Sequence, residues 1–320
     1  MKILVTGGAG FIGSATAKAL MDRGDEVILI DNFNDYYDPN LKHDRLGIFL
    51  KEYAGKYTPY EGDIRDVDFL ETVFATEAVD KVIHLAAMAG VRSSLLDPSL
   101  YADVNIQGTL RMLDMAVKYK IKNFIYASSS SVYGNNTKMP FAESDSVDTP
   151  ISPYAATKKA TELLAHVYHH IYKLNTTGLR FFTVYGPWGR PDMGVFQFVD
   201  KVVRGETIEV YNFGEMRRNF TYIDDIVSGI LTVLDADLAY DIVNIGGDRD
   251  DALLDYIAAI EKHSGKKAEK KMMPMQPGDV TSTVADITKL RALGWAPTTR
   301  IDEGVKQFVE WYRAYYKVER

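Results

Sequence analysis

The sequence predicts an α/β fold, a doubly wound parallel sheet followed by a smaller C-terminal α/β region. Short apolar segments typical of buried strands alternate with amphipathic segments of helical length along the first part of the 320-residue chain. Such alternation implies strand–helix–strand units, which place a parallel sheet between two layers of helices. We expect strands at residues 2–6, 26–30, 57–61, 81–86, 122–127 and 177–182. We expect helices near residues 11–23, 66–77, 98–119 and 153–173.

The first strand–helix unit carries a glycine-rich turn. The apolar strand runs into Gly7, Gly10 and Gly13, where the first helix begins. Glycines at these positions allow a tight turn, close approach of the backbone to a pyrophosphate, and close packing of helix on strand. The free N–H groups and the positive dipole end of the helix also favour a phosphate. The turn predicts a Rossmann-type dinucleotide site with contacts from Gly7, Gly10, Phe11, Ile12 and Gly13.

Asp31, which follows the second strand, indicates which dinucleotide binds. A carboxylate at that point accepts hydrogen bonds from the adenosine ribose hydroxyls and repels a 2′-phosphate, so we expect NAD rather than NADP. Ligands of such sheets bind beyond the carboxyl ends of the strands. The residues that follow the next three strands are therefore further candidates: Asp63, Ala86, Ala87 and Ser128 to Ser131.

Composition excludes several classes of protein. The chain has no cysteine, which rules out disulfides, thiolate catalysis and cysteine-ligated metals. Its net charge of −7 argues against a nucleic-acid partner. No apolar run approaches the roughly 20 residues that span a membrane, and no His/Asp/Glu spacing suggests a metal site. Because a core strand stands at the start, we expect no signal peptide and a cytoplasmic enzyme.

The character of the chain changes after about residue 185. Residues 186–191 are rich in glycine and proline, and the strands and helices expected after them are shorter. We predict an NAD-binding domain over residues 1–185, which includes the helix at 153–173. Residues 186–320 would form a substrate-binding domain, with some elements returning to the main sheet.

Tyr154 and Lys158 form the candidate acid–base pair. They are four residues apart at the start of a helix and therefore share one helix face. An ammonium beside a phenol lowers the pKa of that phenol, so Tyr154 could take a proton from a sugar hydroxyl. The serine run Ser128 to Ser131 ends a strand and would give the site a rim of hydroxyl donors. The plain alternative is a surface pair on a helix and a serine-rich turn.

These motifs together resemble the extended short-chain dehydrogenase/reductase family, and within it the NAD-dependent nucleotide-sugar 4-epimerases. The resemblance covers essentially the whole chain and is carried by the glycine turn, Asp63-Ile64, His84-Leu85-Ala86-Ala87, Asn105, the serine run, Tyr154 with Lys158, and Val184-Tyr185-Gly186-Pro187. It implies that Ser129, Tyr154 and Lys158 form the catalytic triad. It also implies a homodimer formed by the helices near 98–119 and 153–173. The cofactor contacts that it implies, besides Asp31 and the glycine turn, are Asn32, Asp63, Ile64, Leu85, Ala86, Ala87, Asn105, Tyr154 and Lys158.

Three segments are similar to UDP-glucuronate 4-epimerases: residues 89–92, 186–193 and 275–280. A uronate carboxylate needs charge-assisted or several neutral hydrogen bonds. Ser130, Ser131 and Thr183 could supply hydroxyl groups, and either Arg92 or Arg190 the cation. Related dehydratases and decarboxylases carry acidic residues where this chain has only serines.

The uridine diphosphate would lie against the C-terminal region. The resemblance implies that Tyr211 stacks on uracil, Arg218 contacts the diphosphate and Asp279 binds the ribose. Arg217 is an alternative to Arg218, because Asn219 stands where the family has aspartate.

The function that we expect is NAD-dependent epimerisation of UDP-glucuronate at C4 to UDP-galacturonate, through a 4-keto intermediate, with tightly bound NAD regenerated in each turnover. The alternatives are a UDP-glucose/UDP-galactose 4-epimerase, a UDP-glucuronate decarboxylase, or an NAD-binding regulator without catalysis.

Overall fold

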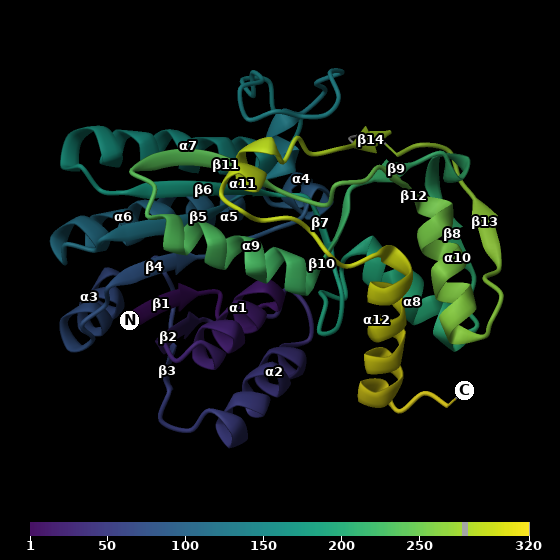
Figure 1. Ribbon diagram of the computed structural model, residues 1–320, viewed down its shortest axis with the longest axis horizontal. Coiled ribbons are helices and arrows are strands. Elements are labelled where there is room, and N and C mark those ends of the chain that lie inside the picture. Colours follow the sequence, from purple (N-terminus) through teal and green to yellow (C-terminus); the bar gives the residue numbers. More distant parts are fainter. Residues whose placement is uncertain (277–280, 320) are drawn as a thin grey trace.

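A computed structural model of the chain describes residues 1–276 and 281–319 (Figure 1). Its centre is a seven-stranded parallel sheet in the order β11-β6-β5-β4-β1-β2-β3. The order reverses between β1 and β4, and open α/β sheets bind their ligands at such a point. The strands are β1 (Lys2–Thr6), β2 (Glu26–Asp31), β3 (Tyr57–Glu61), β4 (Lys81–His84), β5 (Asn123–Ser129), β6 (Thr176–Phe181) and β11 (Tyr240–Ile245).

Two helical layers cover this sheet, and β1 shows why. Successive side chains of a strand point to opposite faces, and the uninterrupted apolar run of β1 is buried on both. Ile3 and Val5 pack in one core with α1 (Phe11–Asp22) and α9 (Ile223–Ala236), which lie side by side (Figure 1). Leu4 packs in the other core, under α3 (Val67–Thr76), α6 (Gly108–Lys118) and α7 (Pro153–Tyr172).

The expected elements agree with these bounds to within a few residues, with one exception. The expected helix at 98–119 is three pieces: α5 (Pro98–Tyr101), a π-helical turn η1 (Ala102–Gln107) and α6. Asn105 lies in the π-helical turn and is 1% exposed. The buried amide of Asn105 makes hydrogen bonds to Met88 and Thr157, which lie on other segments of the chain. A pattern of apolar spacing does not predict such contacts.

Two helices near the first strands were not expected, α2 (Pro39–Glu52) and α4 (Val91–Leu96). The inward face of α2 includes Leu41, Lys42 and Arg45, all of them buried. Because two of these three side chains are basic, the helix has no apolar stripe and looks like a connection in the sequence.

The second half of the chain builds smaller units at one end of the molecule (Figure 1). Strand β7 (Thr183–Tyr185) pairs with β10 (Phe220–Tyr222), and β8 (Ile208–Val210) with β13 (Lys270–Met272). Strand β9 (Arg217–Arg218) lies between β12 (Asp251–Ala252) and β14 (Ser282–Thr283). Since α9 and β11 join the large sheet, a domain boundary at residue 185 stays a prediction.

Helices α8 (Gly194–Arg204), α10 (Leu253–Ser264) and α12 (Ile301–Tyr316) pack on one another at the same end (Figure 1). The remaining short elements are η2 (Ser130–Tyr133), η3 (Tyr211–Gly214) and α11 (Thr288–Ala292). Over residues 1–276 and 281–319, none of the helices combines the length and the apolar character needed to cross a membrane.

Candidate active site

A cavity of about 380 Å³ opens beyond the carboxyl ends of the first five strands. It extends from the glycine turn, past the ends of β2 to β5, to the first turns of α7 and the segment after β6. The fold therefore brings together residues that are far apart in the sequence. The expected site residues that line it are Gly7, Gly10, Phe11, Ile12, Gly13, Asp31, Asn32, Asp63, Ile64, Leu85, Ala86, Ala87, Ser129, Ser130, Ser131, Tyr154, Lys158, Thr183 and Arg190.

The glycine turn leaves no room for side chains. Gly7 has a φ of +68°, and a Cβ atom there would lie 2.9 Å from the backbone nitrogen of Ala86. A Cβ atom on Gly13 would lie 2.0 Å from the carbonyl oxygen of Gly7. Gly10 is the N-cap residue of α1, and no side chain caps this end of the helix. The first N–H groups of α1 therefore face an open concave surface. This backbone cradle fits a pyrophosphate.

Asp31 and its neighbours form an acidic end of the cavity. The two carboxylate oxygens of Asp31 accept hydrogen bonds from the backbone nitrogens of Ala9 (3.0 Å) and Phe33 (2.9 Å). Each oxygen keeps a second lone pair that can accept a hydroxyl. Asn32 donates to Asp63 at 3.0 Å, and hydrogen bonds from Arg65 lower the pKa of Asp63 to about 2. Fixed carboxylates here suit ribose hydroxyls and disfavour a further phosphate.

Tyr154 lies in the first turn of α7, which Ser152 caps by accepting a hydrogen bond from Ala155 at 3.1 Å. Lys158, one turn later, is 4% exposed and donates to the carbonyl of Ala127 at 2.8 Å. Burial lowers the pKa of Lys158 to about 7. Burial raises the pKa of Tyr154, while Ser129 and the charge of Arg190 lower it. The expected net lowering of the Tyr154 pKa is therefore not what the structure gives, because burial outweighs the other influences.

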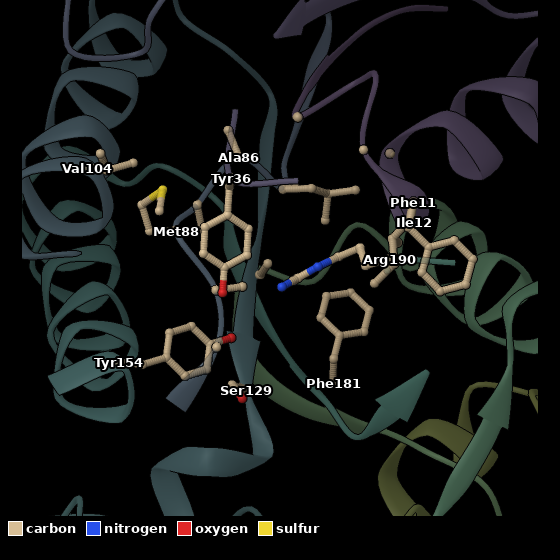
Figure 2. A pocket seen from close by; sticks show the side chains of 18 of the residues that line it. Phe11, Ile12, Tyr36, Ala86, Met88, Val104, Ser129, Tyr154, Phe181 and Arg190 are labelled. Carbon is tan, nitrogen blue, oxygen red and sulfur yellow. The ribbon is translucent and has the colours of Figure 1, made fainter. Parts of the chain in front are cut away.

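The four serines of the run all line the cavity, the first two from the end of β5 and the last two from η2. Ser128 turns inward and donates to Glu162 at 2.6 Å. Ser129, the last residue of β5, turns to the cavity, where Figure 2 shows it in the same space as Tyr154. Its hydroxyl accepts a hydrogen bond from the backbone nitrogen of Ser131 at 3.1 Å, which begins the turn η2. The candidate residues Ser128 to Ser131 thus all contribute to the cavity wall, and the hydroxyl of Ser128 is engaged by Glu162.

Arg190 brings a positive charge into the cavity. Figure 2 shows its side chain reaching toward Tyr36, whose ring centroid lies 5.6 Å from the guanidinium carbon. Asp192 accepts hydrogen bonds from Nε (3.0 Å) and Nη2 (2.5 Å) of Arg190. Of the two candidate cations for a carboxylate, Arg190 lines the cavity and Arg92 does not. The guanidinium of Arg92 instead lies over the ring of Tyr211, 5.5 Å from its centroid.

Several expected residues lie outside the lining of this cavity. Asn105 accepts from the nitrogen of Met88 at 2.8 Å and donates to the Met88 carbonyl and to Thr157, both at 2.9 Å. Its polar atoms therefore support the wall at Met88, and the expected contact of Asn105 with the cofactor stays a prediction. Tyr211 donates to Glu209 at 2.7 Å, and Arg218 donates to the carbonyl of Arg217 at 2.8 Å. Asp279 lies outside the residues that the structure describes.

The cavity also contains residues that the sequence analysis missed. Tyr36, Tyr37 and Lys42 come from the segment between β2 and β3, and Met88 and Gly90 from the segment after β4. The available signal was the length of the first segment, since long connections in compact domains are commonly functional. In the described part of the chain, the His, Asp and Glu side chains form no group of three or more that could hold a metal ion.

Residues 3–246 match the NAD dependent epimerase/dehydratase family. UDP-glucuronate 4-epimerase 4 of Arabidopsis thaliana is 45% identical to this chain, over 99% of the chain and 76% of its own length. The structure of a UDP-glucuronic acid 4-epimerase from Bacillus cereus, in complex with UDP-glucuronic acid and NAD, is 35% identical with a TM-score of 0.93. It covers 99% of this chain and 100% of the other.

A UDP-glucose 4-epimerase from Thermotoga maritima, solved with UDP-glucose, is also similar. It is 32% identical with a TM-score of 0.88, over 99% of this chain and 100% of the other. The family match extends over well more than half of the chain and includes the glycine turn, the serine run and the Tyr154–Lys158 pair. The protein therefore belongs to the NAD dependent epimerase/dehydratase family.

Proposed function

We propose that the protein epimerises UDP-glucuronate at C4 to UDP-galacturonate, with NAD as a resident cofactor. One observation carries the proposal. Tyr154 and Ser129, which can move a proton, line the same cavity as Arg190 and Thr183, which can bind a carboxylate. The similar proteins named above include epimerases for this substrate.

The residues of the cavity fit NAD. The cradle at Gly7 and Gly13 would hold the pyrophosphate, and Asp31 the adenosine ribose. Lys158, fixed by the carbonyl of Ala127, would donate to the nicotinamide ribose. The chemistry that NAD supplies when bound is reversible acceptance of a hydride from C4 of the sugar.

Tyr154 acts on the proton of the C4 hydroxyl in this proposal. Its phenolic oxygen accepts that proton during oxidation and returns it after the 4-keto sugar has presented its other face. Ser129 hydrogen-bonds the same sugar oxygen and helps to lower the pKa of Tyr154. Lys158 is buried, which keeps water away from its ammonium group beside the reacting atoms.

Ser130, Ser131, Thr183 and Arg190 would bind the carboxylate. The 4-keto intermediate is a β-keto acid, which loses carbon dioxide when the breaking bond stands perpendicular to the ketone plane. Hydroxyl groups from two directions, η2 and β7, together with one cation, can hold the carboxylate away from that angle. This arrangement favours epimerisation over decarboxylation.

Uridine contacts by Tyr211, Arg218 and Asp279 remain part of the proposal and rest on the family resemblance. The stacking of Arg92 on Tyr211 gives this region an aromatic surface beside a cation, which suits a pyrimidine diphosphate. Replacing Tyr211 with Ala should weaken the binding of UDP and of UDP-glucuronate equally. An effect on UDP-glucuronate without one on UDP would count against the uracil contact.

A UDP-glucose/UDP-galactose 4-epimerase is the second candidate, because one of the similar solved structures is that of a UDP-glucose 4-epimerase. The charge of Arg190 in the cavity favours a uronate. NMR of the products formed from UDP-glucuronate and UDP-glucose, without added coenzyme, distinguishes the two. We expect UDP-galacturonate from the first substrate and little or no UDP-galactose from the second, and the reverse outcome would overturn the proposal.

We further propose a homodimer that forms through α7. Leu163, Val167 and Ile171 follow one another at four-residue spacing on α7 and are 55%, 44% and 59% exposed. An apolar stripe along one side of a surface helix is typical of a helix–helix interface, and a two-fold axis would place two copies of it together.

The proposal also includes a cytoplasmic location, where NAD and UDP-sugars are available. Cell fractionation can test this location.

A further inference from the structure

Arg45 of α2 is one of the largest side chains that the fold buries completely, at 1% exposed. Its guanidinium forms no ion pair with any carboxylate within residues 1–276 and 281–319. Burial lowers the pKa of Arg45, but a guanidinium in a protein stays protonated. A buried cation without a counterion is costly, so its position needs a reason beyond packing.

All the hydrogen bonds of Arg45 go to neutral oxygens on two segments that line the cavity and on one tyrosine. Nη1 donates to the carbonyl of Ala9 in the glycine turn (3.1 Å) and to the hydroxyl of Tyr37 (2.7 Å). Nε and Nη2 both donate to the carbonyl of Trp188, at 3.1 and 2.6 Å. Nη2 also donates to the carbonyl of Gly189 at 3.2 Å. One guanidinium thus joins the glycine turn to the two residues that precede Arg190.

The segment at Trp188 is held from a second side. Trp188 has a φ of +63°, a left-handed conformation that is strained for a bulky residue and persists only when its surroundings hold it. Its ring lies 5.1 Å from Trp311 and 5.0 Å from Tyr315 of α12, centroid to centroid. The hydroxyl of Tyr315 in turn donates to Asp44, the neighbour of Arg45 on α2. The backbone just before Arg190 is therefore clamped between α2 and α12.

We propose that Arg45 is a positioning residue for recognition of the uronate. It holds the carbonyls of Trp188 and Gly189 against the glycine turn, so that the Arg190 side chain enters the cavity at one place. The inference rests on the proposed function, in which Arg190 faces the sugar carboxylate. Arg45 then governs the preference for UDP-glucuronate over UDP-glucose without touching either sugar.

The test compares Arg45→Lys and Arg45→Met with the wild-type holoenzyme. Calorimetric titration gives the Kd of UDP-glucuronate and of UDP-glucose, and the bound NAD is measured on the same samples. We expect the Kd of UDP-glucuronate to rise about tenfold or more in Arg45→Met, the size of a lost charge-assisted hydrogen bond. The Kd of UDP-glucose should change by less than about threefold. Arg45→Lys keeps the charge without the planar fork and should fall between the wild type and Arg45→Met.

A merely structural role would weaken the binding of both sugars equally, and that outcome would overturn the inference. If Arg45→Met does not fold, the same comparison is made with Arg45→Lys. Arg313→Met is the matched control, since Arg313 also donates to a backbone carbonyl, that of Ser264, but lies outside the cavity lining. It should leave the ratio of the two Kd values unchanged.

Arg190→Gln separates this inference from the proposed function. If Arg45 acts through Arg190, Arg45→Met should cost no further affinity for UDP-glucuronate in the Arg190→Gln background. An undiminished loss in that background overturns the inference alone. An Arg190→Gln enzyme that keeps its full preference for UDP-glucuronate overturns the role of Arg190 in the proposed function, and the role of Arg45 with it.

Discussion

Glu162 and Arg180 form a two-pronged ion pair in the interior, directly behind the serine run. Nε of Arg180 lies 2.8 Å from Oε1 of Glu162, and Nη2 lies 2.9 Å from Oε2. Their side chains are 4% and 3% exposed. Glu162 also accepts from Ser128, and Arg180 donates to Tyr133 at 3.0 Å. The pair therefore anchors the end of β5, the strand that carries Ser129 to the cavity.

Replacing Glu162 with Gln should destabilise the fold strongly, because it leaves the Arg180 charge buried without its partner. We expect a loss of about 3 kcal/mol or more in the free energy of unfolding, measured by urea denaturation. Lys122→Ala is the control, since it breaks an exposed ion pair with Asp80 and should cost less than about 1 kcal/mol. Similar losses in the two variants would contradict the anchoring role.

Tyr154→Phe removes the oxygen that accepts the C4 proton in the proposed mechanism. We expect kcat to fall by about 10²- to 10⁴-fold, the range for loss of a general base, while the NAD content of the purified protein stays the same. Product NMR and cofactor extraction check the two parts. Tyr60→Phe removes a hydroxyl on β3 that donates to Glu77, and this variant should keep full activity. A Tyr154→Phe enzyme with near-normal kcat would sink the mechanism.

Thr183→Ala and Ser130→Ala each remove one hydroxyl from the proposed carboxylate clamp. With fewer contacts the carboxylate of the 4-keto intermediate can turn to the angle at which carbon dioxide leaves. We expect the fraction of UDP-pentose among the products to rise in both variants, measured by NMR. No rise in either variant, with epimerisation still running, would count against the clamp.

His84 should make the folded state sensitive to acid. Its Nδ1 lies 2.7 Å from the Thr6 hydroxyl, which accepts from the backbone nitrogen of Ala86, and its Nε2 lies 3.1 Å from the Thr109 hydroxyl. Both ring nitrogens therefore face hydroxyl groups, which can each donate or accept, so the contacts suit a neutral ring. Burial, with the charge of Lys158, lowers the pKa of His84 from 6.5 to about 3.

The unfolded chain therefore binds a proton at His84 below pH 6.5, while the folded protein stays neutral there down to about pH 3. As the pH is lowered through that window, the free energy of unfolding decreases, with a limiting slope of about 1.4 kcal/mol per pH unit from this group. His84→Gln lacks this contribution. The free energies of unfolding of the wild type and of His84→Gln are measured between about pH 7 and about pH 4.5. We expect the stability advantage of the wild type over the variant to shrink as the pH is lowered. An advantage that is constant with pH would refute the assignment, and the exposed His170→Gln serves as control.

Val167→Glu places a charge in the middle of the apolar stripe on α7. If two copies pair through this stripe, the buried charge should convert the dimer into a monomer, measured by analytical ultracentrifugation. Leu254→Glu changes a residue that is 39% exposed on α10, outside the stripe, and should leave the oligomeric state unchanged. A wild-type protein that sediments as a monomer would overturn the proposed dimer directly.

The sheet and the glycine turn could be predicted because their signals are local. An apolar run of strand length, a glycine at each tight position and an acidic residue after β2 all act within a few residues of one another. The same holds for Tyr154 and Lys158, which one turn of helix places on one face. The helix α2 could not be predicted in this way, since Lys42 and Arg45 replace the apolar residues that its inward face would normally carry.

The linear order of residues thus contained the strands, the dinucleotide turn and the candidate acid–base pair, since each depends on neighbours along the chain. The place of Arg190 in the cavity wall, the inward turn of Asn105 and the contact of Arg45 with Trp188 depended on the tertiary structure, with the last of these joining residues 143 apart. Such contacts follow from how the packed layers meet in space, where burial and hydrogen bonding select among partners that local spacing leaves equivalent.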